Sequence, residues 1–216
     1  MKTLFLLTQW WSRREGPMLR AALAKLIYGG PNIQIGSSFR CDGMPRCLVD
    51  PDAKLTVGNN VEFRSGIEIR AHDSARIVIE DGVRIDRGVR ILAANKALVR
   101  ISNGARIGLY SVLNGGDSIH VGRKCLISGF VYLQTSMHRV ETPNVAIRDQ
   151  GYDHAPIQIG DGAWLGSHVV VMPGRVIGMD AVVGSNGVVT RDIADRMIVA
   201  GVPARVVKER TDNRIS

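Results

Sequence analysis

The chain has 216 residues, of which 45% are hydrophobic and 22% charged, so it can bury a core and is not mainly disordered. No apolar run approaches 18 residues and the stretch 4–7 is too short for a signal-peptide core, so the sequence predicts neither a spanning helix nor a leader. The net charge of +8 is spread along the chain without zinc-finger spacing or a basic region before heptads, which argues against nucleic acid as a partner and leaves an anionic ligand or a solvated basic face.

Residues 1–30 are predicted to form a helical segment. Pro17 suits a first helical turn, and Gly29 and Gly30 would end the helix. Four aliphatic residues fall on one helical face: Leu19, Leu23, Leu26 and Ile27. One interpretation is a helix that caps the open end of a coil stack. The other is a membrane-surface helix that uses two tryptophans and four basic residues: Trp10, Trp11, Arg13, Arg14, Arg20 and Lys25.

Residues 31–195 carry an internal repeat with a period near 22 and a finer period of six. An apolar residue leads each of eighteen six-residue units. These leaders are Val57, Phe63, Ile69, Ile79, Ile85, Ile91, Ile101, Ile107, Leu113, Val121, Ile127, Leu133, Ile159, Leu165, Val171, Ile177, Val183 and Val189. A leucine-rich repeat lacks the six-residue period, and a helix turns every 3.6 residues. Six residues fit a short strand plus a corner, so three units make one triangular coil, and stacked coils place the leaders in interior ladders.

Glycine follows several leaders, and we attribute it to the tight corners. These glycines are Gly58, Gly108, Gly122, Gly160, Gly166, Gly178 and Gly184.

The step from Val121 to Ile159 is 38 residues long, whereas the preceding step is 20, and the surplus predicts an extruded loop over residues 139–156. The loop begins directly after His138, where a side chain leaves the packed wall and can face a cleft. A positioned imidazole can accept the proton of a weakly nucleophilic hydroxyl at neutral pH, so His138 is the predicted general base.

The other four histidines receive weaker assignments. We expect His72 and His120 to be exposed, His154 to line a pocket within the loop, and His168 to lie at a subunit contact. The zinc pattern of β-helical carbonic anhydrases needs two histidines five residues apart, and no such pair occurs, so no metal site is predicted. Three cysteines, Cys41, Cys47 and Cys125, do not form a disulfide framework and suggest reduced thiols in a cytoplasmic protein.

Segments 135–138, 157–167, 171–174, 188–193 and 200–208 together resemble the galactoside/maltose O-acetyltransferase branch of the hexapeptide-repeat acyltransferases. The resemblance implies an all-β fold, a left-handed parallel β-helix with a short N-terminal helix and the extruded loop. Its handedness follows from the resemblance alone, because ordinary parallel crossovers are right-handed. Residues 196–216 would form a C-terminal tail.

The same resemblance implies a set of functional residues. His138 occupies the place of the catalytic histidine, while Asn114 and Asp117 look like the residues that hold the acceptor sugar. Seven positions correspond to contacts with coenzyme A: Trp164, Ser167, Ser185, Thr190, Arg191, Arg205 and Lys208. Acetyl-CoA would be the co-substrate, no metal would be needed, and the protein would be a homotrimer whose loop reaches a neighbour.

The predicted function is therefore acetyl-CoA-dependent O-acetylation of a saccharide by direct transfer. Two alternatives stay open: N-acetylation of an amino-sugar nucleotide or an aminoglycoside-like amine, and a non-catalytic β-helix scaffold. The branch's usual N-terminal module before the first coil, which supplies an acidic residue to the acceptor site, has no evident counterpart here, and the basic segment 1–30 stands in its place. An acceptor for bacterial surface polysaccharide, held on a lipid carrier, would suit a cytoplasmic protein that contacts the inner face of the membrane through residues 1–30.

Overall fold

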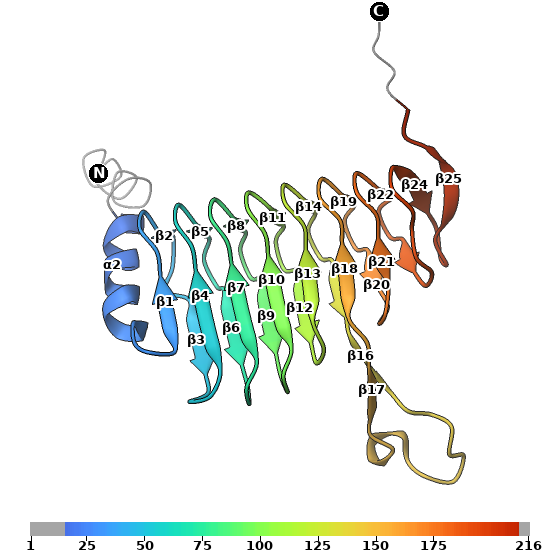
Figure 1. The fold of residues 1–216 in the computed structure, drawn as a ribbon, viewed down its shortest axis with the longest axis horizontal. Helices are drawn as coiled ribbons and strands as arrows, with labels where there is room; N and C mark the ends of the chain where they lie inside the picture. Colours follow the sequence, from blue (N-terminus) through green and yellow to red (C-terminus); the bar gives the residue numbers. More distant parts are fainter. Residues whose placement is uncertain (1–15, 212–216) are drawn as a thin grey trace, which may run out of the picture.

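The computed structural model describes residues 16–211, which form a triangular prism of parallel strands (Figure 1). Sheet A contains β1 (Ile33–Ile35), β4 (Lys54–Val57), β7 (Arg76–Ile79), β10 (Leu98–Ile101), β13 (Ile119–Val121), β18 (Ile157–Ile159) and β21 (Val176–Ile177). Sheet B contains β2 (Arg40–Cys41), β5 (Glu62–Phe63), β8 (Arg84–Ile85), β11 (Arg106–Ile107), β14 (Leu126–Ile127), β19 (Trp164–Leu165), β22 (Val182–Val183), β24 (Met197–Ala200) and β25 (Arg205–Glu209). Sheet C contains β3 (Arg46–Val49), β6 (Glu68–Ala71), β9 (Arg90–Ala93), β12 (Val112–Gly115), β15 (Tyr132–Gln134), β20 (Val170–Val171) and β23 (Val188–Val189).

The interior of the prism consists of the predicted leader residues. All eighteen are buried, with at most 3% of the residue surface exposed. Each leader pairs with the leader one coil away, as Val57 does with Ile79 and Phe63 with Ile85. Because every strand exposes both edges to a neighbouring coil, one coil is stabilised only by the coils above and below it. The predicted parallel β-helix of hexapeptide repeats is confirmed.

The glycines that follow the leaders serve a different purpose from the one predicted. Gly160 does not have a positive φ, but a Cβ on it would lie 2.6 Å from the backbone nitrogen of Met179 in the next coil. The left-handed residue of the same corner is Gly162, at φ 70°, two positions later. Glycine is therefore required after the leader because neighbouring coils approach closely there, and the sharp turn lies further along.

The N-terminal helix α2 (Gly16–Tyr28) covers the first coil, but not with the face that the leucines suggest (Figure 1). Its buried residues are Gly16, Pro17, Ala21 and Ala24. The four aliphatic residues that share one helical face are 45–81% exposed, so the helix does cap the first coil, as one interpretation predicted, but packs on it through its small residues. Small residues let the helix approach the coil closely, and the bulky side chains point outward. Trp10, Trp11, Arg13 and Arg14 lie outside the described residues.

Residues 197–209, predicted as part of a tail, form two strands. Strand β24 joins sheet B beside β22 in parallel, and β25 returns antiparallel to it. The antiparallel pair closes the C-terminal end of the prism and holds Arg205 and Lys208 on sheet B (Figure 1).

Candidate active site

The extruded segment starts as a two-stranded ribbon that leaves the corner between sheets C and A. Strand β16 (Ser136–His138) pairs antiparallel with β17 (Tyr152–His154), and a short 3-10 helix, η2 (Ile147–Asp149), lies in the loop between them. The ribbon therefore begins three residues before the predicted loop of 139–156. It projects away from the prism, as Figure 1 shows below β18.

One face of this ribbon gathers four side chains that can move protons or donate hydrogen bonds. Alternation along the strands places Ser136 and His138 on the same face, opposite His154 and Tyr152 respectively. The ring of His138 lies 4.1 Å from that of Tyr152, centroid to centroid, and the ring of His154 lies 6.1 Å further along the same row. His154 Nδ1 is 2.8 Å from Ser136 Oγ. His138 itself is exposed, which leaves its ring nitrogens accessible to a substrate.

A polar cluster lies at the root of the ribbon. The Asp117 backbone N–H donates to Thr135 Oγ1 at 3.1 Å, and that hydroxyl donates to the Asn114 carbonyl oxygen at 2.7 Å. Asn114 Nδ2 donates to the side-chain oxygen of Gln134 at 3.2 Å and contacts the Tyr132 hydroxyl at 3.3 Å. These bonds fix the two predicted acceptor residues on the sheet C side of the corner.

Gly116, between those two residues, is required for this arrangement. A Cβ at this position would lie 2.8 Å from His154 Nδ1 and would overlap Ser136 Oγ. Within one chain, His154 thus lies against the acceptor residues, and His138 lies one step further out. Sequence reasoning named His154 only as a pocket residue and did not name Ser136 or Tyr152, because their roles depend on a cross-strand register that the repeat does not predict.

Five of the seven predicted coenzyme A residues share one surface, on sheet B and its corner with sheet C. Trp164, which is 47% exposed, lies on the outer face of β19, and its indole nitrogen donates to Ser128 Oγ at 3.2 Å. Ser167 and Ser185 occupy the same corner in successive coils, where the Asn186 backbone N–H donates to the Ser167 carbonyl oxygen at 2.8 Å. Strand pairing then brings Lys208 opposite Ile198, and Arg205 opposite Ala200.

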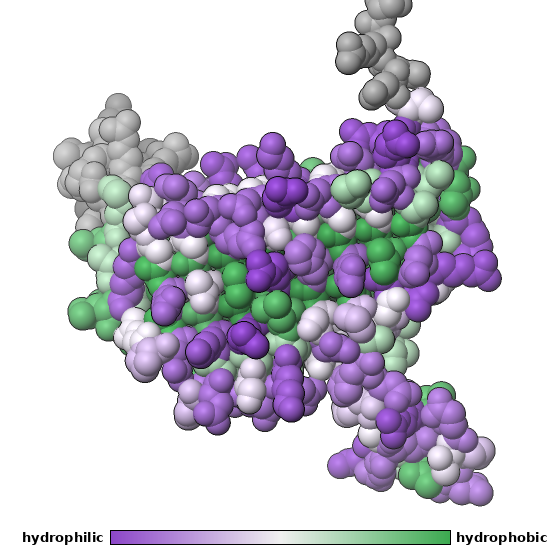
Figure 2. Space-filling view, viewed as in Figure 1, coloured by the Kyte–Doolittle hydropathy of each residue, from purple (hydrophilic) through white to green (hydrophobic). Residues whose placement is uncertain are grey.

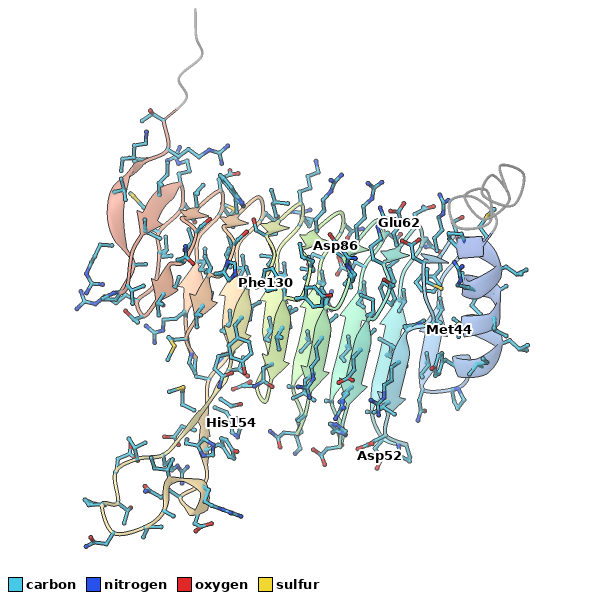
Figure 3. All side chains as sticks on the ribbon, turned by 180° about the vertical axis from the view of Figure 1, so that it is seen from behind. Met44, Asp52, Glu62, Asp86, Phe130 and His154 are labelled. Carbon is cyan, nitrogen blue, oxygen red and sulfur yellow. The ribbon has the colours of Figure 1, made fainter. Side chains whose placement is uncertain are left out.

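The other two, Thr190 and Arg191, lie elsewhere. They follow β23, at the corner between sheets C and A from which the ribbon also leaves. Sheet C therefore separates the ribbon, Asn114 and Asp117 from the sheet B surface. Figure 3 shows His154 at the ribbon and, on the body of the prism, Phe130, which lies between β14 of sheet B and β15 of sheet C. The structure does not bring all the predicted site residues together in a single chain.

Cys125 does not belong to this site. It is buried, and its thiol donates to the Gly160 carbonyl oxygen at 3.0 Å. Burial raises the pKa of Cys125 to about 11, and burial likewise raises the pKa of Cys41 to about 11 and that of Cys47 to about 12. At neutral pH all three thiols are protonated and poorly nucleophilic, which argues against an acyl-cysteine intermediate.

Thiol reagents should test this directly. At pH 8 a pKa near 11 leaves about one thiol in a thousand ionised, so the three cysteines of the folded protein should react with a disulfide reagent at least 100-fold more slowly than in denaturant. The measurement is the rate of chromophore release with and without urea. Rapid labelling of Cys125 in the folded protein, together with loss of transferase activity, would restore the acyl-cysteine route.

Comparison with known proteins also identifies hexapeptide repeats in this chain. Residues 156–191 match the family described as bacterial transferase hexapeptide (six repeats). The chain is 38% identical over 96 residues to the galactoside O-acetyltransferase of Escherichia coli, covering 44% of this chain and 46% of that protein. It is 33% identical over 100 residues to the putative lipopolysaccharide biosynthesis O-acetyl transferase WbbJ of the same species, covering 43% and 51%. The chain thus spans about half the length of these relatives.

A solved structure shares the fold over most of its length. A mutant of AntD, an N-acyltransferase from Bacillus cereus in complex with an amino-dideoxyglucose nucleotide and coenzyme A, has a TM-score of 0.56 at 14% identity, over 89% of both chains. At that identity the likeness concerns the fold alone. The hexad repeat and the three-sided coil thus agree with the match of residues 156–191 to the bacterial transferase hexapeptide family, and over about half its length the chain is similar to two O-acetyltransferases of Escherichia coli.

Proposed function

We propose that the protein is an acetyl-CoA-dependent O-acetyltransferase that acts on a saccharide, with His138 as general base. The observation that carries this proposal is the ribbon face, where an exposed imidazole stands beside the phenol of Tyr152, above an amide and a carboxylate at the ribbon root. Asn114 and Asp117 can pair with sugar hydroxyls, and the neighbouring Ser136 and His154 add two further polar groups.

The proposed reaction is a direct transfer. His138 takes the proton of a sugar hydroxyl while that oxygen attacks the acetyl carbonyl carbon, so that a carbon–oxygen bond forms and the carbon–sulfur bond breaks. Coenzyme A leaves as a thiolate, and the protonated imidazole returns the proton to its sulfur. Ser136 and His154 would orient the acceptor at the ribbon root, because their own hydrogen bond fixes both side chains.

The sheet B surface fits the nucleotide end of the co-substrate. Trp164 offers an exposed ring, and Arg205 and Lys208 offer exposed cations on the same sheet, which suits pantetheine packing and phosphate pairing. Because this surface lies across sheet C from the ribbon, we propose that each site combines the ribbon of one subunit with the sheet B surface of its neighbour in a homotrimer.

A column of aromatic rings beside that surface supports a subunit contact at the corner between sheets B and C. Tyr110 stacks on Phe130 with centroids 5.6 Å apart, and Phe130 stacks on His168 at 4.8 Å with planes 6° apart. All three have positive φ, between 53° and 61°, which is costly for bulky side chains. The rings are half exposed in one chain, and a second copy would bury them.

The experiment that tests the function is an acceptor screen. The protein is incubated with acetyl-CoA and pooled sugars, sugar nucleotides, amino sugars and glycans, and free thiol and acetylated product are measured. Thiol release that depends on a hydroxyl acceptor, with an alkali-labile ester in the product, is expected. An amide product would favour N-acetylation, and the absence of thiol release with every acceptor would favour the scaffold alternative.

Replacing Arg205 should weaken acetyl-CoA binding selectively. We expect Arg205→Ala to raise the KM for acetyl-CoA by about 3- to 30-fold, because one exposed phosphate contact is lost, with little effect on the KM of the acceptor. The effect should shrink with acetyl-pantetheine, which lacks the nucleotide, and at high salt. The matched control is Arg76→Ala, which removes an exposed arginine of sheet A. Equal KM values for Arg205→Ala and wild type at low salt would remove Arg205 from the co-substrate site.

A further inference from the structure

The outward face of α2 is strongly apolar, although no residue among 16–211 covers it. Leu26 is 81% exposed, Leu19 and Ile27 are each 58% exposed, and Leu23 is 45% exposed. These four residues lie on the side opposite Ala21 and Ala24, which pack on the first coil. Figure 2 shows the hydrophobic side chains at the N-terminal end of the prism, beyond the polar rim of the coils. An apolar strip of this kind on a solvent-facing helix indicates a binding surface.

Two cations border the strip, one on each side. On a helical projection with 100° per residue, Arg20 falls just beyond Ile27 at one edge. On the other side the exposed Ala22 and Met18 continue the apolar surface, and Lys25 falls beyond Met18. The helix has no acidic residue in its 13 positions, and the described part of the chain pairs neither cation with a carboxylate. Long basic side chains at the edges of an apolar strip are the arrangement that places an amphipathic helix flat in a membrane interface, with cations at the level of the headgroups.

We propose that this strip binds the surface of an anionic lipid bilayer. A second copy of the chain is disfavoured as the occupant, because facing strips would bring four cations together with no acidic partner. The charge of the whole chain, +8, also favours an anionic surface. No helix within residues 16–211 is long and apolar enough to cross a membrane.

The geometry of the prism gives this contact a definite orientation. The helix runs across the end of the prism, roughly perpendicular to its long axis (Figure 1). When the helix lies flat on the bilayer, the long axis of the prism is therefore roughly perpendicular to the membrane plane. With about 4.8 Å per coil and 8–10 Å for the helix layer, the histidine ribbon at the fifth coil would lie roughly 30 Å above the surface. The proposal does not depend on acetyl transfer, so the binding test and the acceptor screen can fail independently.

The test is flotation of the full-length chain with vesicles of phosphatidylcholine, with and without phosphatidylglycerol. We expect the protein to float with the anionic vesicles at low salt and to bind neutral ones at least tenfold less. Leu19→Glu combined with Leu26→Glu should reduce binding at least tenfold, because two exposed apolar groups become charged. Arg20→Gln with Lys25→Gln should lower binding and flatten its dependence on salt.

The matched control is Met179→Glu combined with Val202→Glu, which introduces the same charge at two exposed apolar positions near the other end of the prism. This control variant should bind vesicles like wild type. The control and the Leu19→Glu/Leu26→Glu variant should both melt at the wild-type temperature. Three results would overturn the proposal. One is wild-type protein that does not float with anionic vesicles at low salt. Another is a Leu19→Glu/Leu26→Glu variant whose oligomeric mass falls in light scattering, which assigns the strip to a second copy. The third is vesicle binding that appears only after residues 1–15 are removed, which would mean that this segment occupies the strip in the full-length chain.

Discussion

Replacing His138 with alanine is expected to lower kcat by about two to four orders of magnitude, because a positioned general base contributes that much to proton removal. The side chain is exposed and lies against the Tyr152 ring, so the melting temperature should stay at the wild-type value. The KM for acetyl-CoA should change little, since the co-substrate surface lies on sheet B. Steady-state kinetics with the acceptor found by the screen, together with a thermal melt, provide the measurement.

Two comparisons make this result specific. His120→Ala removes an exposed imidazole from sheet A and should leave kcat unchanged. His154→Ala breaks the hydrogen bond to Ser136 at the ribbon root and should raise the KM of the acceptor more than it lowers kcat. If His138→Ala keeps more than a tenth of the wild-type turnover while His154→Ala loses nearly all of it, the base is His154 and the assignment of His138 is wrong.

The repeat predicts the fold well because the spacing of its apolar residues determines how they can be buried. A leader every six residues can be buried only if three sides close a coil and the coils stack, and all eighteen leaders are buried as expected. For α2, the apolar periodicity did not predict which residues pack on the first coil. Its periodicity indicated an apolar face, but not which face meets the coil, and the close approach at the first coil favours Ala21 and Ala24 over the leucines.

The site was predictable only in part, for a similar reason. His138 could be proposed because it ends the regular repeat, whereas the placement of Ser136, Tyr152 and His154 beside it depends on the register of an antiparallel ribbon that lies outside the hexads. The two strands after residue 196 were also missed. Strand β25 has five exposed residues and therefore no buried leader, whereas the buried Val199 of β24 does not follow the last leader, Val189, at the six-residue spacing. Nor does the sequence reveal that sheet C separates the ribbon from the sheet B surface, since the two sets of residues interleave along the chain.

Complementation between two inactive variants is expected to test that separation. His138→Ala disables the ribbon, and Trp164→Glu combined with Arg205→Glu disables the sheet B surface at limiting acetyl-CoA. If each site takes one half from each of two adjacent subunits, co-expression of the two variants with different tags should produce mixed trimers in which about a third of the sites, one in each mixed trimer, carry both intact halves. Tandem affinity purification followed by the transferase assay should then give roughly that share of wild-type activity, although each parent is nearly inactive.

The control pairs His138→Ala with Asn114→Ala, which lies at the root of the same ribbon, so that its mixed trimers should gain far less. Mixed trimers of the first pair that are no more active than their parents would mean that each chain builds its own site, and that the ribbon must fold back across sheet C to reach the co-substrate.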